Sequence, residues 1–122
     1  MTEEVSWKQQ CKDLLKTLNH SEDSVPFREP IDTLYAPEYL EVIDHPMDLQ
    51  TVLEELQSGN YGTPSEFAKD VRLIFENSKN YNPNELSKIY GMTVRLSILF
   101  EDLIRNILTF YEIQKTAAGC RS

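Results

Sequence analysis

The sequence predicts an all-α protein, a four-helix bundle with a long first interhelical loop. Four segments place apolar residues three and four positions apart, the spacing that gives a helix one apolar face. No segment shows the sustained alternation of apolar and polar residues that is typical of a half-buried strand. With 122 residues, of which 40% are hydrophobic, the chain is long enough for one domain with its own core.

The first helix is expected over residues 3–18. Glu3 and Glu4 suit the positive N-terminal end of its dipole. Its apolar stripe consists of Trp7, Cys11, Leu14 and Leu18.

The second helix is expected after Pro46, with Asp48 as its N-cap and Gly59-Asn60 as its stop. Three turns fit between these signals. Its buried face consists of Leu49, Val52, Leu53 and Leu56.

The third helix has the clearest start signal in the chain. Thr63 can cap it, Pro64 suits its first position, and Glu66 can complete a capping box. Pro83 ends it. Its inner face consists of Phe67, Val71, Ile74, Phe75 and Ser78.

The fourth helix is the longest, and residues 116–122 after it are expected to form a frayed, disordered tail beyond a domain of residues 1–115. Short connections after the second and third helices favour antiparallel neighbours in a bundle. The inner face of the fourth helix consists of Ile89, Met92, Leu96, Leu99, Leu103, Ile107 and Phe110.

Residues 19–45 form a connection too long to be an ordinary loop, and a long structureless segment in a compact domain is usually functional. Prolines within it restrict its backbone. Its apolar density predicts that it packs on one end of the bundle and forms a pocket wall. The apolar residues expected to pack are Val25, Phe27, Ile31, Leu34, Tyr35 and Tyr39.

The net charge of −8 argues against a general nucleic-acid binder and favours a basic partner. Residues 20–60 hold ten of the twenty acidic residues and a single arginine, Arg28. The alternative is an ordinary solvated acidic face, and a salt titration of binding separates the two.

Motifs for catalysis and for metal binding are missing from the sequence. There is no phosphate-binding glycine loop and no Gly-x-Ser-x-Gly elbow, and a carboxylate dyad has no positive support. His20 and His45 have no ligand partners at useful spacing. We therefore expect no enzyme, no cofactor and no metal site. No stretch is long and apolar enough for a signal or membrane segment, and the two cysteines are far apart, which favours an intracellular protein.

Several motifs together resemble the bromodomain signature in order and spacing. They are PFREPID (26–32), PEY (37–39), IDHPMDL (43–49), NY (60–61) and NSKNYNP (77–83). The resemblance extends over residues 7–111. Within the family, residues 69–75, 87–90 and 95–97 look like the second bromodomain of the WD-repeat bromodomain proteins. The resemblance implies a left-handed four-helix bundle whose first and last interhelical loops enclose an acetyl-lysine pocket.

The resemblance also implies roles for single residues. Asn82 matches the asparagine whose side-chain amide donates to the acetyl carbonyl. Tyr39 matches the tyrosine whose hydroxyl holds an ordered water on the same oxygen, and Tyr81 lies beside the asparagine. The gatekeeper position falls on Ile89, with Lys88 as the alternative because the preceding loop is one residue longer than in many relatives.

The sequence departs from the family pattern at two places in the pocket wall. Val25 stands where the family's Trp-Pro-Phe shelf has tryptophan, which removes aromatic area. The first loop is shortened near residues 33–36, so Tyr35 is the alternative to Leu34. The wall residues implied by the resemblance are Pro26, Phe27, Ile31 and Leu34.

An uncharged asparagine suits acetyl-lysine because its amide donates without attracting a cation, while burying the unmodified ammonium without a partner costs several kcal/mol. At about 0.5–1 kcal/mol for each of roughly eight atoms, the affinity is expected to be millimolar to micromolar. The expected partners are acetylated histone tails, bound by a monomeric nuclear module that targets a larger protein to chromatin. The alternative function is a helical protein-interaction module with degenerate acetyl-lysine recognition.

Overall fold

The computed structural model describes residues 6–32, 34 and 36–119, and every regular element within these ranges is helical. The bundle consists of α1 (Trp7–His20), α3 (Leu49–Gln57), α4 (Pro64–Tyr81) and α5 (Lys88–Gly119). The connection between α1 and α3 contains the 3-10 helix η1 (Glu22–Phe27) and the single-turn helix α2 (Tyr39–Val42). The predicted all-α class and four-helix architecture are confirmed.

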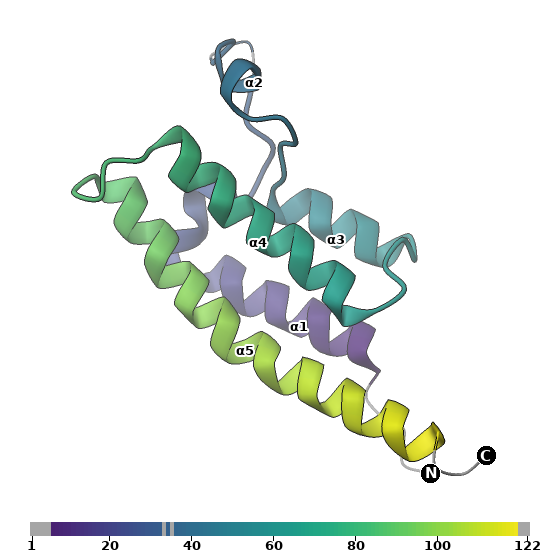
Figure 1. The fold of residues 1–122 in the computed structure, drawn as a ribbon. Helices are drawn as coiled ribbons and strands as arrows, with labels where there is room; N and C mark the ends of the chain where they lie inside the picture. The colour runs from purple at the N-terminus through teal and green to yellow at the C-terminus, as the bar shows by residue number, and fades with distance from the viewer. Residues whose placement is uncertain (1–5, 33, 35, 120–122) are drawn as a thin grey trace.

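The bundle helices form a closed ring of contacts, in which α1 packs on α3 and α5 and α4 packs on the same two helices (Figure 1). The short helix α2 projects beyond the bundle at the end where α4 finishes, and it contacts the bundle through α4. The start of α1 meets the late part of α5 at the opposite end, where the rings of Trp7 and Tyr111 lie 6.3 Å apart, edge to face. No helix in the described ranges has both the length and the apolar character to cross a membrane.

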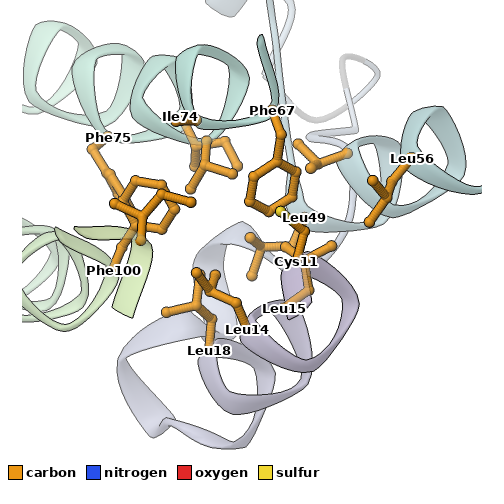
Figure 2. Close-up of a cluster of buried hydrophobic side chains, with 14 of the residues drawn as sticks. Cys11, Leu14, Leu15, Leu18, Leu49, Leu56, Phe67, Ile74, Phe75 and Phe100 are labelled. Carbon is orange, nitrogen blue, oxygen red and sulfur yellow. The ribbon is translucent and has the colours of Figure 1, made fainter. Parts of the chain in front are cut away.

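The core lies between the four helices and contains the predicted faces of α1, α3 and α4 (Figure 2). Phe67 and Phe100 are fully buried, and Phe75 contacts Phe100 with ring centroids 6.0 Å apart. Trp7 and Leu53 are partly buried at the edge of this cluster. Burying each such aromatic side chain contributes about 1.5–3 kcal/mol, so the bundle needs no cross-link.

The start of α1 lies later than predicted. Ser6 caps the helix by accepting a hydrogen bond from the backbone N–H of Gln9 at 3.1 Å. The helix ends at His20, two residues beyond the predicted end. Glu3 and Glu4, to which we assigned a dipole role, lie outside the described residues.

The predicted caps of α3 and α4 are confirmed, with one difference. Asp48 accepts from the backbone N–H of Thr51 at 2.9 Å, and Thr63 accepts from that of Glu66 at 3.3 Å. The Glu66 carboxylate bonds to the N–H of Gly62 at 2.7 Å instead of closing the box on Thr63. The α3 stop is also as predicted, since Gly59 adopts φ +76°, which favours glycine.

The inner face of α5 differs from the predicted stripe toward its end. The fully buried positions in the middle of the helix are Leu96, Phe100 and Ile104, whereas Phe110 is 39% exposed. A stripe drawn at alternating spacings of three and four follows a 3.5-residue period and drifts from a 3.6-residue helix over several turns. The helix also continues to Gly119, within the segment for which we expected a frayed tail.

The long connection is more structured, and less buried, than predicted. Within η1, Phe27 is buried, and Tyr39 on α2 is also buried. Val25, Ile31 and Leu34 are instead exposed, which corrects the expectation that all its apolar residues pack on the bundle. The short elements η1 and α2 lie outside the ring of four helices, so each buries only the side chains that face the bundle. Tyr35, also expected to pack, lies outside the described residues.

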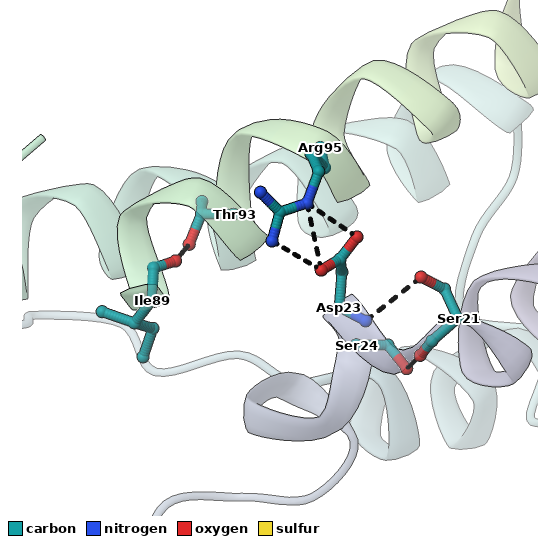
Figure 3. A network of polar contacts seen from close by, with 6 residues as sticks. All are labelled: Ser21, Asp23, Ser24, Ile89, Thr93 and Arg95. Carbon is teal, nitrogen blue, oxygen red and sulfur yellow. Dashed lines mark hydrogen bonds and ion pairs between the residues drawn. The ribbon is translucent and has the colours of Figure 1, made fainter. Parts of the chain in front are cut away.

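Two arginines hold η1 in place. Arg28 donates to the backbone carbonyls of Asn19 and Ser21, at 2.7 and 3.1 Å, which joins the end of η1 to the end of α1. Arg95 of α5 forms an ion pair with Asp23 at 3.0 Å (Figure 3). The start of the loop is therefore fixed on both α1 and α5.

Candidate functional site

A cavity of about 40 Å³ lies at the end of the bundle where α4 finishes and α5 begins, under the first long connection. Aliphatic and aromatic side chains form most of its wall, and a few polar groups lie among them. Its lining residues are Pro26, Phe27, Glu29, Ile31, Tyr39, Met47, Asp48, Ile74, Ser78, Tyr81, Asn82 and Ile89.

The structure brings together most of the predicted site residues, although they come from η1, the loop after it, α2, the end of α4 and the start of α5. The predicted residues that line the cavity are Pro26, Phe27, Ile31, Tyr39, Tyr81, Asn82 and Ile89. The gatekeeper alternative, Lys88, does not line it.

Val25 and Leu34, both predicted for the wall, do not line the cavity. Val25 is 57% exposed and Leu34 is 89% exposed. The exposure of Leu34 follows from its place in an Asx turn. Its backbone N–H donates to the Asp32 carboxylate at 2.9 Å. Both side chains lie on the surface of the loop.

Five lining residues were missed by the sequence reasoning. Ile74 and Ser78 had a usable signal, because they precede Asn82 by eight and four residues and so share its face of α4. Asp48 was predicted only as the N-cap of α3, and Glu29 and Met47 lie in loop segments whose path no local pattern predicts.

Asn82 is the C-cap residue of α4, and its backbone N–H donates to the carbonyl of Ser78 at 2.8 Å. The backbone bond fixes the residue, while its half-buried side-chain amide forms no hydrogen bond with another described residue. Both amide protons and the amide oxygen are therefore available to a ligand in the cavity.

Tyr39 and Tyr81 form an aromatic pair on one side of the cavity, with ring centroids 4.8 Å apart and planes inclined at 64°. The Tyr81 hydroxyl donates to the Oε1 atom of Glu38 at 2.9 Å. Tyr39 is 5% exposed, and burial raises the pKa of its hydroxyl, which stays protonated at neutral pH. That hydroxyl has no hydrogen-bond partner within the described part of the chain, so it can bind water or a ligand.

Two hydroxyl groups lie under the cavity between α4 and α5. Ser78 Oγ and Thr93 Oγ1 are 2.7 Å apart. Thr93 donates to the carbonyl oxygen of Ile89 at 2.7 Å, as Figure 3 shows. Thr93 is fully buried. This contact joins the end of α4 to the first turns of α5.

The acidic groups of the cavity differ in whether they can bind a cation. The Asp48 carboxylate is 5% exposed, and both of its oxygens accept hydrogen bonds from Thr51, which makes it a helix cap. Glu29 lines the cavity but is exposed to solvent. No group of three metal-ligating side chains occurs among the described residues. The arrangement suits a small neutral ligand with an apolar stem and one hydrogen-bonding carbonyl.

The comparisons with known proteins agree on one family. The bromodomain family model matches residues 11–94. Transcription factor GTE11 of Arabidopsis thaliana is 40% identical over 115 residues, which are 93% of this chain and 17% of that protein. The nucleosome-remodeling factor subunit NURF301 of Drosophila melanogaster is 38% identical over 98 residues, which are 80% of this chain and 4% of that protein. The chain thus spans less than a fifth of these curated relatives.

A solved structure supports the same assignment at the level of the fold. The bromodomain from human BAZ1A matches with a TM-score of 0.77 and 26% identity, covering 88% of this chain and 96% of that one. The chain belongs to the bromodomain family of acetyl-lysine reader modules.

Proposed function

We propose that the cavity binds the acetylated lysine side chain of histone tails, with Asn82 as the residue that recognises the acetyl group. The observation that carries the proposal is the unpartnered Asn82 amide beside a mostly apolar cavity. The uncharged amide can donate a hydrogen bond to the carbonyl of a neutral acetyl-lysine. The ammonium of unmodified lysine would lose its hydration in the cavity without gaining a counter-ion.

The other lining residues have supporting roles in this proposal. The Tyr39 hydroxyl holds an ordered water that donates to the acetyl carbonyl, and Phe27 and Ile89 contact the aliphatic stem from opposite sides. Pro26, Ile31 and Tyr81 complete the wall. The small volume of about 40 Å³ suits an acetyl group better than a larger acyl group.

A basic peptide is the partner that the charge distribution supports. Glu29 lines the cavity, and Glu38 and Glu41 are exposed beside Tyr39 on and next to α2. Opposite charge raises the rate at which a basic tail associates more than it raises final affinity. Affinity from one side chain is expected to be weak, so neighbouring modules of a larger protein would add avidity.

The cellular setting and the subfamily are also proposals. The names of two relatives, a transcription factor and a nucleosome-remodeling factor subunit, support a nuclear, chromatin-associated module. We further propose that the module acts as a monomer and corresponds to the second bromodomain of a WD-repeat protein. The motifs at residues 69–75, 87–90 and 95–97 support that subfamily.

The alternative is a protein-interaction module with degenerate acetyl-lysine recognition. Val25 favours it, because this residue replaces the shelf tryptophan and is 57% exposed outside the cavity wall. Loss of aromatic area on one side would weaken or redirect peptide binding.

Calorimetric titration with histone-tail peptides, each in an acetylated and an unmodified form, tests the proposal. We expect measurable binding of acetylated peptides and much weaker binding of their unmodified partners. Equal affinity for both forms would exclude acetyl-lysine reading and favour the alternative. An array of modified histone peptides would then identify the preferred tail and position.

A further inference from the structure

The two hydroxyl groups under the cavity have a single possible direction of hydrogen bonding. Each hydroxyl has one proton to donate. Thr93 donates its proton to the carbonyl oxygen of Ile89 at 2.7 Å, so in the 2.7 Å contact with Ser78 it must be the acceptor. Ser78 therefore donates to Thr93, and Thr93 donates to Ile89.

These bonds are part of a longer chain across the base of the cavity. At its α4 end, the backbone N–H of Asn82 donates to the carbonyl of Ser78 at 2.8 Å. At its α5 end lies Ile89, a wall residue in the first turn of α5. The Ser78 and Thr93 side chains thus link the turn that carries Asn82 to the turn that carries Ile89.

The peptide segment between Asn82 and Ile89 provides no comparable constraint. Residues 83–86 are exposed, and the hydrogen bonds of Leu86 and Ser87 are formed with Asn84 inside the same loop. Exposed loops with only local bonds open at low free-energy cost. The buried hydroxyl pair, with Thr93 fully enclosed, joins the end of α4 to the start of α5. Outside the cavity wall, Lys79 also lies over the Tyr90 ring at 6.0 Å between the same two helices.

We infer that Ser78 and Thr93 are positioning residues that set the separation between Asn82 and Ile89 and thereby limit the size of the acyl group the cavity accepts. This inference rests on the proposed function, because it assigns the selectivity of the same cavity. The ligand class is lysine carrying a short acyl group, with acetyl preferred over propionyl and butyryl.

The test measures binding of one histone-tail peptide carrying acetyl-, propionyl- or butyryl-lysine at a single position. Thr93→Val keeps the branched shape and removes the hydroxyl, whereas Thr93→Ser keeps the hydroxyl. We expect Thr93→Val to weaken acetyl binding by about three- to tenfold, the effect of one net hydrogen bond, and to lower the acetyl-to-butyryl affinity ratio by a similar factor. Thr93→Ser should keep the wild-type ratio.

Further variants separate positioning from general loss of stability. Ser78→Ala should lower the ratio as Thr93→Val does, and the double variant should add little, because both changes break one chain of bonds. Ser97→Ala is the matched control, since Ser97 lies on α5 and donates to the carbonyl of Val94 at 2.8 Å, away from the cavity. It should leave the ratio unchanged. If Thr93→Val does not fold, Thr93→Ala compared with Thr93→Ser decides, because Thr93 does not line the cavity whereas Ser78 does.

The possible failures are distinguishable. Wild-type protein that binds none of the three peptides would overturn the proposed function. Wild-type binding with an acetyl-to-butyryl ratio that Thr93→Val and Ser78→Ala leave unchanged would overturn the positioning role alone. A ratio that falls equally in Thr93→Ser or Ser97→Ala would also overturn it, because the effect would then not depend on this chain of bonds.

Discussion

Tyr81 donates a 2.9 Å hydrogen bond to Glu38, the residue that precedes Tyr39, while its ring contacts the Tyr39 ring. One α4 side chain thus holds two consecutive residues of a segment that projects beyond the four bundle helices (Figure 1). A second bond, from the Asn77 side-chain amide to the carbonyl of His45 at 2.8 Å, holds the far end of that segment. The position of the Tyr39 hydroxyl therefore depends on α4.

Removing the Tyr81 hydroxyl should weaken ligand binding without unfolding the protein. Tyr81→Phe keeps the ring contact with Tyr39 but loses the bond to Glu38, so α2 becomes less well positioned. We expect about a threefold loss of affinity for a neutral acetyl-lysine amide and an unchanged melting temperature. Titration with that uncharged ligand avoids any direct effect of Glu38 on a basic peptide. Tyr90→Phe is the control, and an equal loss there would contradict the prediction.

The same bond predicts a pH dependence of binding. The pKa of Glu38 is lowered from its ordinary value of 4.5, first by a backbone hydrogen bond and then by the Tyr81 hydroxyl. A carboxylate whose pKa is lowered in the folded protein stabilises the structure fully at pH values above its ordinary pKa. That stabilisation is lost as the pH falls through the lowered pKa. Binding of the neutral ligand should be constant from about pH 7 to about pH 5 and fall in more acidic solution. Tyr81→Phe should reduce this fall, and an identical fall in both proteins would assign it to other groups.

Asn82→Ala should abolish binding of acetylated peptide and leave the fold intact. The side-chain amide has no partner within the described part of the protein, and the backbone N–H that bonds to Ser78 is retained. Circular dichroism and thermal melting should therefore match the wild type. Asn80, exposed two residues earlier, provides the control variant Asn80→Ala. Binding that survives in Asn82→Ala would mean that the site is misplaced.

Tyr39→Phe should weaken binding less than Asn82→Ala does. The variant keeps the buried ring and its contact with Tyr81, and would lose only the water-mediated contact that we propose for the acetyl carbonyl. We expect about a two- to tenfold loss by calorimetry. A loss greater than that of Asn82→Ala would reverse the proposed ranking of the two residues.

Salt should weaken binding of a basic acetylated peptide through screening of the acidic surface around the cavity. The Debye length shortens to about 8 Å at physiological ionic strength, which reduces attraction between exposed charges. Stopped-flow measurements should show the loss mainly in the association rate. The neutral acetyl-lysine amide should show no such dependence. If salt leaves the association rate of the peptide unchanged, the acidic residues form an ordinary solvated face that does not attract the peptide.

The helical parts of the site could be predicted from local sequence, and the loop parts only in part. Ile74, Ser78 and Asn82 share one face of α4 by spacing alone, although only Asn82 was assigned to the site. Whether a side chain of the long connection is exposed depends on which side of its turn faces the bundle. The apolar composition of the loop does not predict this side, so the exposure of Val25 and Leu34 was missed. The motif resemblance assigned Tyr39 to the site through its spacing from Pro26-Phe27 and from Pro46-Met47-Asp48, and Tyr39 lines the cavity.

The contact between Trp7 and Tyr111 has a practical consequence for measuring ligand affinity. Trp7 is the single tryptophan, and it lies where α1 begins, at the opposite end of the bundle from the cavity. Its indole emission therefore reports whether α1 and α5 remain packed together. Ligand binding in the distant cavity should not change this emission. Melting curves can therefore be followed by this emission with and without ligand, and the ligand itself should not alter the signal of the folded protein. The gain in stability caused by the ligand then reports its affinity.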